Sequence, residues 1–277
     1  MFKSKTFNPD IVREINRGTL RGASPQEMKT LYIRQNCFDV EEKCQIFRIF
    51  QLPYQLADIS DSKFTLVNLA KYNDRYENPL LNKVFIDETG DPLTLNEIAG
   101  HSYVSPWTFD PIENPYSWPL YTRSCLGIRI KSTVGKIMHE MLNLDNPFCM
   151  FHFYAGLVDY FEQKDIDNWL SECHYTDFLD SLGQLSVSSL MALRNRFSDE
   201  KEIRFVFRLI PANTKNPFIK NHVIIRDNLC KHPINWTSVI DEIVLDPLIK
   251  DEEFEKTVRK LRAHGLTFDI RHSICRY

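Results

Sequence analysis

Residues 197–209 (FSDEKEIRFVFRL) constrain the fold of this chain more than any other stretch. After a charged turn, apolar positions alternate with mostly charged ones: Ile203, Phe205, Phe207 and Leu209 alternate with Glu202, Arg204, Val206 and Arg208. A period of two over eight residues predicts a β-strand with one face in the core. The protein must therefore contain a sheet in which the apolar face of this strand is covered.

The other face of this predicted strand is charged. Glu200, Glu202 and Arg204 share one phase, so the pattern E-x-E-x-R places two carboxylates and a guanidinium in one row. Such a row suits an acid/base pair beside an anion-binding arginine. It is equally typical of a solvent-exposed strand face with a cross-strand salt bridge. Spacing alone leaves both interpretations open.

Length and charge narrow the class of protein. The 277 residues fit one large domain or two small ones, with a sizeable core. The net charge of −3 gives no overall sign of a nucleic-acid-binding or anionic-membrane-binding protein. No window approaches about 18 uninterrupted apolar residues, and the first residues lack the apolar core of a signal peptide. We therefore expect no membrane partner, while the oligomeric state stays open.

Seven cysteines are scattered along the chain without a C-x-x-C pair. The odd number and the spacing argue against a disulfide framework and against a zinc knuckle. We therefore predict reduced thiols and a cytoplasmic protein.

Residues 1–45 are predicted to form an accessory helical segment, and residues 46–277 a single domain. In the first segment, Ser24 and Glu27 have the spacing of a capping box, with Pro25 at the first helical position. In the domain, the segments with strand patterns are residues 45–50, 63–70, 101–109, 125–132, 148–161, 203–209, 221–226, 240–247 and 266–273. The longest, residues 148–161, is nearly all apolar and is predicted to lie centrally in a sheet.

Helical patterns occupy residues 114–123, 134–142, 165–196 and 251–265. Strands outnumber β-α-β units, which predicts an α+β fold with one mixed, largely antiparallel sheet flanked by helices. The chain has no glycine-rich phosphate-binding loop of the two common types, which argues against P-loop and Rossmann nucleotide binding.

Five groups of residues form a motif string along the chain. They are Arg48 in QIFRIF; Asn73, Asp74 and Glu77; Trp118 and Tyr121; Gly127–Thr133; and Phe197, Glu200, Glu202 and Arg204. With the closing strand–helix–strand unit, this string resembles a widespread bacterial domain family of unknown function over residues 46–275. Arg75 and Tyr76 stand where that family usually has proline and phenylalanine, and Pro119 directly follows the tryptophan.

The order of these groups is also similar to that of ADP-ribosyltransferases. The resemblance implies NAD as the substrate, an ADP-ribosyltransferase-like fold, and a transferase or NAD glycohydrolase acting as a bacterial toxin or phage-defence effector. It implies these roles: Glu202 and Glu200 catalytic, and Arg48, Tyr121, Trp118, Ser132 and Arg204 in NAD binding. The acceptor, a protein or a nucleic acid, is left undefined.

NAD cleavage requires these residue types. Breaking the nicotinamide–ribose bond builds positive charge on the ribose, as in the oxocarbenium-like transition state of glycosidases. A carboxylate such as Glu202 stabilises that charge. An arginine such as Arg48 binds a pyrophosphate through paired N–H groups.

Each of these residues also has a structural interpretation. Arg48 lies on an otherwise apolar stripe, so it either pairs with a buried carboxylate or faces a cleft. Ser132 can cap the helix that follows it, together with Thr133. Trp118 and Tyr121 bury enough area to serve as core residues.

Two other functions remain open. A non-catalytic module of a bacterial stress or defence system would bind a small anion or a partner protein at the charged strand. A metal-dependent hydrolase would use five side chains: Asn73, Asp74, Glu77, Glu200 and Glu202. No histidine pair at i, i+4 supports a zinc site, and we expect no metal. The decisive observation is whether Arg48, Tyr121, Ser132 and Glu202 line one pocket.

Overall fold

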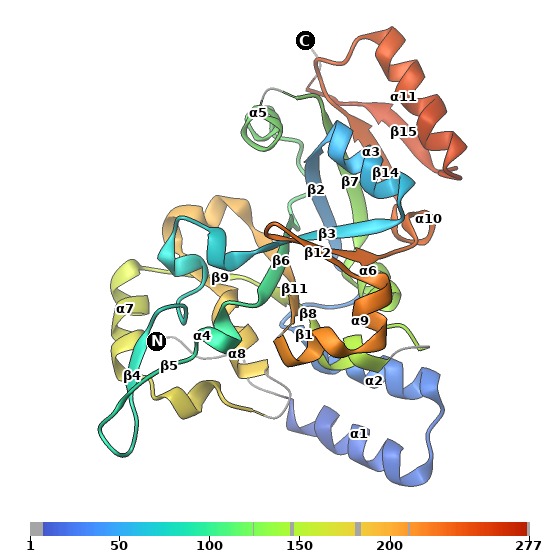
Figure 1. Cartoon of the computed structure of the whole chain (residues 1–277). Helices are drawn as coiled ribbons and strands as arrows, with labels where there is room; N and C mark the ends of the chain where they lie inside the picture. Colours follow the sequence, from blue (N-terminus) through green and yellow to red (C-terminus); the bar gives the residue numbers. More distant parts are fainter. Residues whose placement is uncertain (1–7, 124, 145–146, 181–183, 210, 276–277) are drawn as a thin grey trace.

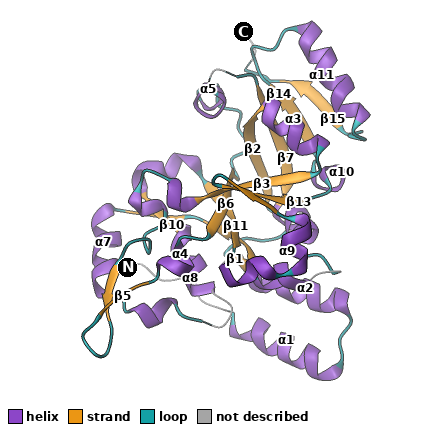
Figure 2. Ribbon diagram, viewed as in Figure 1, coloured by secondary structure: helices purple, strands orange, loops and turns teal. Residues whose placement is uncertain are grey.

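The computed structural model describes residues 8–123, 125–144, 147–180, 184–209 and 211–275. Its centre is a large mixed sheet surrounded by helices (Figure 1, Figure 2). The strand order is β1 (Cys37–Phe38), β8 (Phe153–Leu157), β11 (Glu202–Arg208), β6 (Ser102–Thr108), β2 (Gln45–Gln51), β7 (Gly127–Thr133), β14 (Glu242–Leu245) and β15 (Asp269–His272). Neighbours on this path are antiparallel except β1–β8 and β14–β15. The predicted α+β class with a mixed, largely antiparallel sheet is confirmed.

A ribbon of three further strands branches from β6. It consists of β3 (Lys63–Asn68), β13 (Leu229–Pro233) and β12 (Ile224–Arg226). Two small pairs lie apart from the main sheet: β4 (Val84–Ile86) with β5 (Pro92–Thr94), and β9 (Asp159–Phe161) with β10 (Ala192–Arg194).

The helices surround the sheet and connect its strands (Figure 2). They are α1 (Pro9–Arg21), α2 (Pro25–Asn36), α3 (Leu52–Ser60), α4 (Asn96–Ala99), α5 (Ser117–Thr122), α6 (Val134–Met141), α7 (Gln163–Glu172), α8 (Gln184–Ser188), α9 (Pro217–His222), α10 (Trp236–Val239) and α11 (Asp251–Ala263). The 3-10 helices include η2 (Arg75–Glu77), η3 (Pro147–Phe151), η5 (Ser189–Met191) and η6 (Asn195–Glu200).

The main sheet is split between β2 and β6. One edge of β6 pairs with β11 over the full length of both strands. On its other edge, β3 pairs at Tyr103 and Val104, and β2 pairs only where Phe47 meets Thr108. In Figure 1, β2, β7, β14 and β15 therefore form an upper half, and β6, β11, β8 and β1 a lower half.

The split has a local cause in β6. Within the described part of the chain, residues 105–107 of β6 have no strand partner on the edge that faces β2. Pro106 lies in this stretch, and proline has no N–H group to donate to a strand ladder. The two halves consequently diverge beyond the single Phe47–Thr108 pair.

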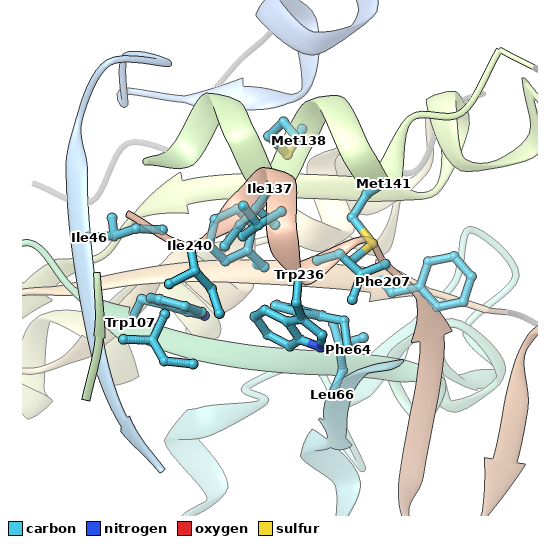
Figure 3. Close-up of a cluster of buried hydrophobic side chains, with 14 of the residues drawn as sticks. Ile46, Phe64, Leu66, Trp107, Ile137, Met138, Met141, Phe207, Trp236 and Ile240 are labelled. Atoms are coloured by element: carbon cyan, nitrogen blue, oxygen red, sulfur yellow. The ribbon is translucent and has the colours of Figure 1, made fainter. Parts of the chain in front are cut away.

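The largest apolar core lies on one side of β11. Phe205 and Phe207 belong to a cluster that also contains Phe64, Trp107 and Trp236. Figure 3 shows the last three with Phe207, between the sheet and the α6 residues Met138 and Met141.

The opposite side of β11 is buried as well. Every residue from Glu202 to Arg208 is buried, and Val206 lies in a second core cluster with Val187, Leu190 and Met191. The interpretation of the charged side as a solvent-exposed strand face is therefore wrong. Alternation showed that the strand has two faces, but not that residues 184–191 cover the charged one.

Most predicted strands are confirmed within a few residues, and four details are wrong. Residues 148–161 do not form one strand, because they divide into η3, β8 and β9. Residues 221–226 are strand only at β12, since α9 runs to His222. Residues 192–194, predicted as helix, form β10 and pair with β9. The strands β1, β4, β5 and β13 were not predicted.

The N-terminal helices are attached to the sheet. The capping box of α2 is confirmed, with the Ser24 N–H donating to Glu27 Oε2 at 2.9 Å. Ile33 of α2 is fully buried in the main core, and β1 pairs with β8. Residues 1–7 of the predicted accessory segment lie outside the described residues, and the division of the chain at residue 45 stays a prediction.

All seven cysteines are among the described residues, and each is a free thiol. None of the helices in the described ranges has the length and apolar character needed to cross a membrane.

Candidate active site

A cavity of about 320 Å³ lies where the sheet splits. The strand residues on its walls come from both halves: residues 47–51 of β2, residues 106–108 of β6, and Arg129 of β7. The loop after β6, α5, η6 and the start of β11 contribute the remaining walls. The cavity therefore occupies the gap left by the missing strand pairing.

Two carboxylates lie at this cavity, Glu200 at the end of η6 and Glu202 at the start of β11. The residue between them, Lys201, has a left-handed backbone with φ of 44°. Its Nζ donates to Asp110 Oδ2 at 2.7 Å, and its carbonyl accepts from the Phe109 N–H at 3.1 Å. These bonds fix the turn to the end of β6, so both carboxylates are held at the cavity.

Arg204 connects Glu202 with a distant loop. Its Nε donates to Glu202 Oε1 at 2.7 Å, its Nη1 to the Leu190 carbonyl at 2.9 Å, and its Nη2 to Glu77 Oε2. The side chain is 3% exposed. Burial favours the neutral form, but Glu202 and Glu77 outweigh it and raise the pKa of Arg204. Arg204 is thus a buried cation that does not line the cavity.

Glu200 titrates near neutrality. Burial and the nearby carboxylates of Glu202 and Glu77 raise the pKa of Glu200 to about 7, although Arg204 opposes the shift. A carboxyl group with such a pKa can both take up and release a proton at physiological pH.

Arg48 lies in the split itself. Its Nη1 donates to the Ser105 hydroxyl, and its guanidinium lies 4.5 Å from the centre of the Phe50 ring. Burial lowers the pKa of Arg48 to about 10, and the nearby Tyr72 and Glu202 oppose this shift. Arg48 therefore stays cationic at neutral pH and lines the cavity.

The two predicted aromatic residues occupy different environments. Tyr121 is 45% exposed and lines the cavity. Burial, followed by Glu200 and Glu202, raises the pKa of Tyr121 to about 12. Trp118 is 2% exposed and packs against Gly127, outside the cavity lining. The structure therefore brings Tyr121, but not Trp118, to the carboxylates.

Ser132 is fully buried and is not part of the cavity lining. Its hydroxyl donates to the Val239 carbonyl at 2.7 Å. Its neighbour Thr133 caps α6, accepting from the Lys136 N–H at 3.3 Å. Of the four residues in the decisive test, Arg48, Tyr121 and Glu202 share the cavity and Ser132 does not.

The predicted loop residues do not line the cavity. Asn73 is exposed, and Asp74 is bound by Arg194 and Arg196. Glu77 reaches the site only through Arg204. Among the described residues, no group of three or more histidine, cysteine, aspartate or glutamate side chains could hold a metal ion. The side chains proposed for a metal-dependent hydrolase therefore do not form one cluster.

Sequence reasoning missed two residues at this site. Arg129 lines the cavity, donates to the Pro111 carbonyl at 2.8 Å and lies 4.2 Å from the centre of the Phe47 ring. The Tyr160 hydroxyl accepts from the Glu202 N–H at 2.9 Å. Arg129 alternates with Ile128 and Ile130 in β7, and both faces of this strand are buried. The sequence shows that Arg129 lies on the face opposite the isoleucines, but not that this face borders a cavity.

Comparisons with known proteins give weak similarities. No family model matches the chain, and no curated protein matches it. Solved structures similar to it include those of DarT from Thermus sp. 2.9 in complex with carba-NAD+, with NAD+ and with ADP-ribosylated ssDNA. Their sequence identities are 10%, 12% and 11%, and their TM-scores are 0.35, 0.34 and 0.34. The matches cover 86%, 86% and 85% of this chain and 100%, 98% and 96% of those chains.

TM-scores of this size are too low to assign a family, a fold or a function. The resemblance to the bacterial domain family of unknown function stays a prediction.

Proposed function

We propose that this protein cleaves NAD and transfers the ADP-ribosyl group to an acceptor. One observation carries the proposal: Arg48, Tyr121, Glu200 and Glu202 line a single cavity, although they come from β2, α5, η6 and β11. These four residues supply a cation, an aromatic phenol and two carboxylates around one space. That set matches the needs of a dinucleotide whose glycosidic bond is to be broken.

Glu202 is the principal carboxylate in this proposal. The bond between the ribose and the nicotinamide nitrogen breaks, its electron pair leaves with nicotinamide, and positive charge develops on the ribose. The Glu202 side chain is 5% exposed, so little water screens its charge. A fixed carboxylate in such a site stabilises the developing charge electrostatically.

Arg48 and Glu200 take the supporting roles. Arg48 provides a cation whose planar N–H groups suit the pyrophosphate. Glu200, with a pKa of about 7, takes the proton of the acceptor when the new bond to the ribose forms. Water in place of the acceptor gives NAD glycohydrolase activity.

The proposal is tested by measuring nicotinamide release from NAD for the wild type, Glu202→Gln and Asp74→Asn. We expect Glu202→Gln to lower the rate by about 10²–10³, the scale for removing one preorganised electrostatic group. Asp74→Asn is the matched control, because it removes a largely buried carboxylate of an ion pair outside the cavity. We expect it to retain the wild-type rate.

Stability must be followed in the same experiment. Glu202 is buried, so Glu202→Gln should lower the free energy of unfolding by about 1–3 kcal/mol, and assays must run well below both thermal midpoints. An unchanged rate in Glu202→Gln would contradict the role of this carboxylate. NAD binding without turnover by the wild type, with cell lysate as acceptor source, would favour a non-catalytic binding module.

We further propose that the acceptor is a macromolecule and that the activity serves a bacterial toxin or phage-defence effector. Transfer of label from ³²P-NAD, followed by protease or nuclease digestion, distinguishes a protein from a nucleic-acid acceptor. Induced expression in bacteria should arrest growth with the wild type and not with Glu202→Gln. Equal growth of the two strains would contradict the toxin role.

A further inference from the structure

The loop before and through η2 is joined to the cavity by one buried guanidinium. Arg204 is shared by Glu77 of this loop and Glu202 of the cavity. The side chains of Glu77 and Glu202 are 13% and 5% exposed, so water does little to weaken these ion pairs. Glu77 itself does not line the cavity.

We propose that Glu77 is a positioning residue for the reaction, which acts by drawing the Nη2 group of Arg204 away from the second carboxylate oxygen of Glu202. The inference rests on the proposed function, because it assigns Glu77 a role in NAD cleavage. Glu77 touches Arg204, and only Glu202 faces the reacting group.

The hydrogen bonds of Arg204 support this division of roles. Arg204 Nε lies 2.7 Å from Glu202 Oε1, whereas Nη2 lies 3.4 Å from Glu202 Oε2 and makes its shorter bond to Glu77. An arginine facing a single carboxylate normally makes two parallel bonds to both oxygens. Here Nη2 donates to both carboxylates, but Glu77 holds it so that its bond to Glu202 Oε2 is long at 3.4 Å, and Glu202 Oε2 keeps capacity to bind substrate.

Removing the charge of Glu77 has two consequences. Nη2 can then move closer to Glu202 Oε2 and shorten the 3.4 Å bond, and a tighter two-bond pair neutralises the carboxylate that should face the ribose cation. The site also loses one of the negative charges that act on Glu200. The Glu200 carboxyl group should then release its proton at lower pH than in the wild type.

The experiment compares Glu77→Gln with Asp74→Asn, a matched variant three residues earlier whose carboxylate binds Arg194 and Arg196 instead of Arg204. We expect Glu77→Gln to lower kcat about tenfold or more with little change in KM, within the range for couplings in one ion-pair network. The pH midpoint of kcat should move to lower pH. Asp74→Asn should leave kcat and the pH midpoint unchanged.

A double variant tests whether Glu77 acts through Glu202. Combined with Glu202→Gln and measured at a pH where Glu200 is fully ionised, the Glu77→Gln change should lower the rate no further. Independent losses that multiply, an unchanged kcat in Glu77→Gln, or an equal loss in Asp74→Asn would overturn the proposal. If Glu77→Gln does not fold, Glu77→Asp replaces it, since it keeps the charge but shortens the reach to Arg204. It should then lower kcat without moving the pH midpoint.

If the wild-type protein does not turn over NAD, both the proposed function and the catalytic role of Glu77 are wrong. The electrostatic coupling between Glu77 and Glu200 can then still be tested by NMR titration of ¹³C-labelled glutamate carboxyl groups. The Glu200 pKa should be lower in Glu77→Gln than in the wild type and unchanged in Asp74→Asn. Equal Glu200 pKa values in all three proteins would overturn the coupling between Glu77 and the cavity.

Discussion

At the scale of single residues, Glu200 makes stability depend on pH. Its pKa of about 7 in the folded chain lies above the ordinary value of 4.5, so the folded chain holds a proton that the unfolded chain releases. The stability gained from this proton is complete below pH 4.5 and is lost as the pH rises through about 7.

We therefore predict that Glu200→Gln becomes more stable relative to the wild type as the pH rises. The amide stays neutral, so the variant lacks the cost of the partly buried charge that the wild type bears above pH 7. The check is the difference in thermal midpoint between the two proteins, measured from about pH 4.5 to about pH 8. A difference that stays constant across this range would show that Glu200 titrates normally.

The sequence predicted which residues line the cavity better than it predicted how deeply those residues are buried. Phase placed Glu200 and Glu202 in one row, and the motif order added Arg48 and Tyr121. All four line the cavity, although Glu200 ends η6 and only Glu202 belongs to the strand. Ser132 also belongs to a motif, but its hydroxyl donates a hydrogen bond to the buried Val239 carbonyl and does not reach the cavity. Phase tells which side of a strand a residue occupies, but the segment that covers that side comes from elsewhere in the chain.

At the scale of elements, the motif Gly127–Thr133 follows from packing around β7. A Cβ atom on Gly127 would lie 2.6 Å from Thr122 Cγ2 and 2.8 Å from Trp118 Cε3, both on α5. Only glycine lets α5 lie this close to the strand. Because α5 also carries Tyr121, this contact determines where the cavity wall stands.

Gly127→Ala should therefore damage both stability and substrate binding. The added methyl group must push α5 outward, and overpacking of this kind costs about 1–3 kcal/mol. We expect a lower urea midpoint together with a higher KM for NAD, because Tyr121 moves with α5. As a control, Gly90→Ala adds a methyl group at a turn outside the cavity lining, where nothing lies within 4 Å but φ is +91°. It should lower stability through backbone strain and leave KM unchanged. An unchanged KM in Gly127→Ala would show that the position of α5 does not affect NAD binding.

Two element predictions failed for a shared reason. The apolar run at residues 148–161 resembles one long strand, but it turns at Val158, whose N–H donates to the Glu202 carbonyl at 3.0 Å. The sequence of strand β13, LCKHP, has no clear strand pattern. The strand forms because it pairs with the edge of β3. In both cases a pairing partner distant in sequence, and not local pattern, determines the structure.

At the scale of the whole molecule, the prediction concerns the thiols. All seven cysteines are free, and Cys149 and Cys230 lie buried in the main core. We expect seven thiols to react with a thiol reagent after denaturation without reductant. A count of five or fewer would mean that at least one disulfide forms in the protein as isolated, and the cytoplasmic prediction would then be withdrawn.

The two halves of the split sheet are interleaved along the chain. The upper half takes residues 45–51, 127–133, 242–245 and 269–272, and the lower half takes residues 37–38, 102–108, 153–157 and 202–208. Any cut between residues 51 and 202 therefore separates strands of both halves. Neither half is one contiguous segment of the chain, so a single exchange of sequence between proteins cannot replace one half and leave the other unchanged.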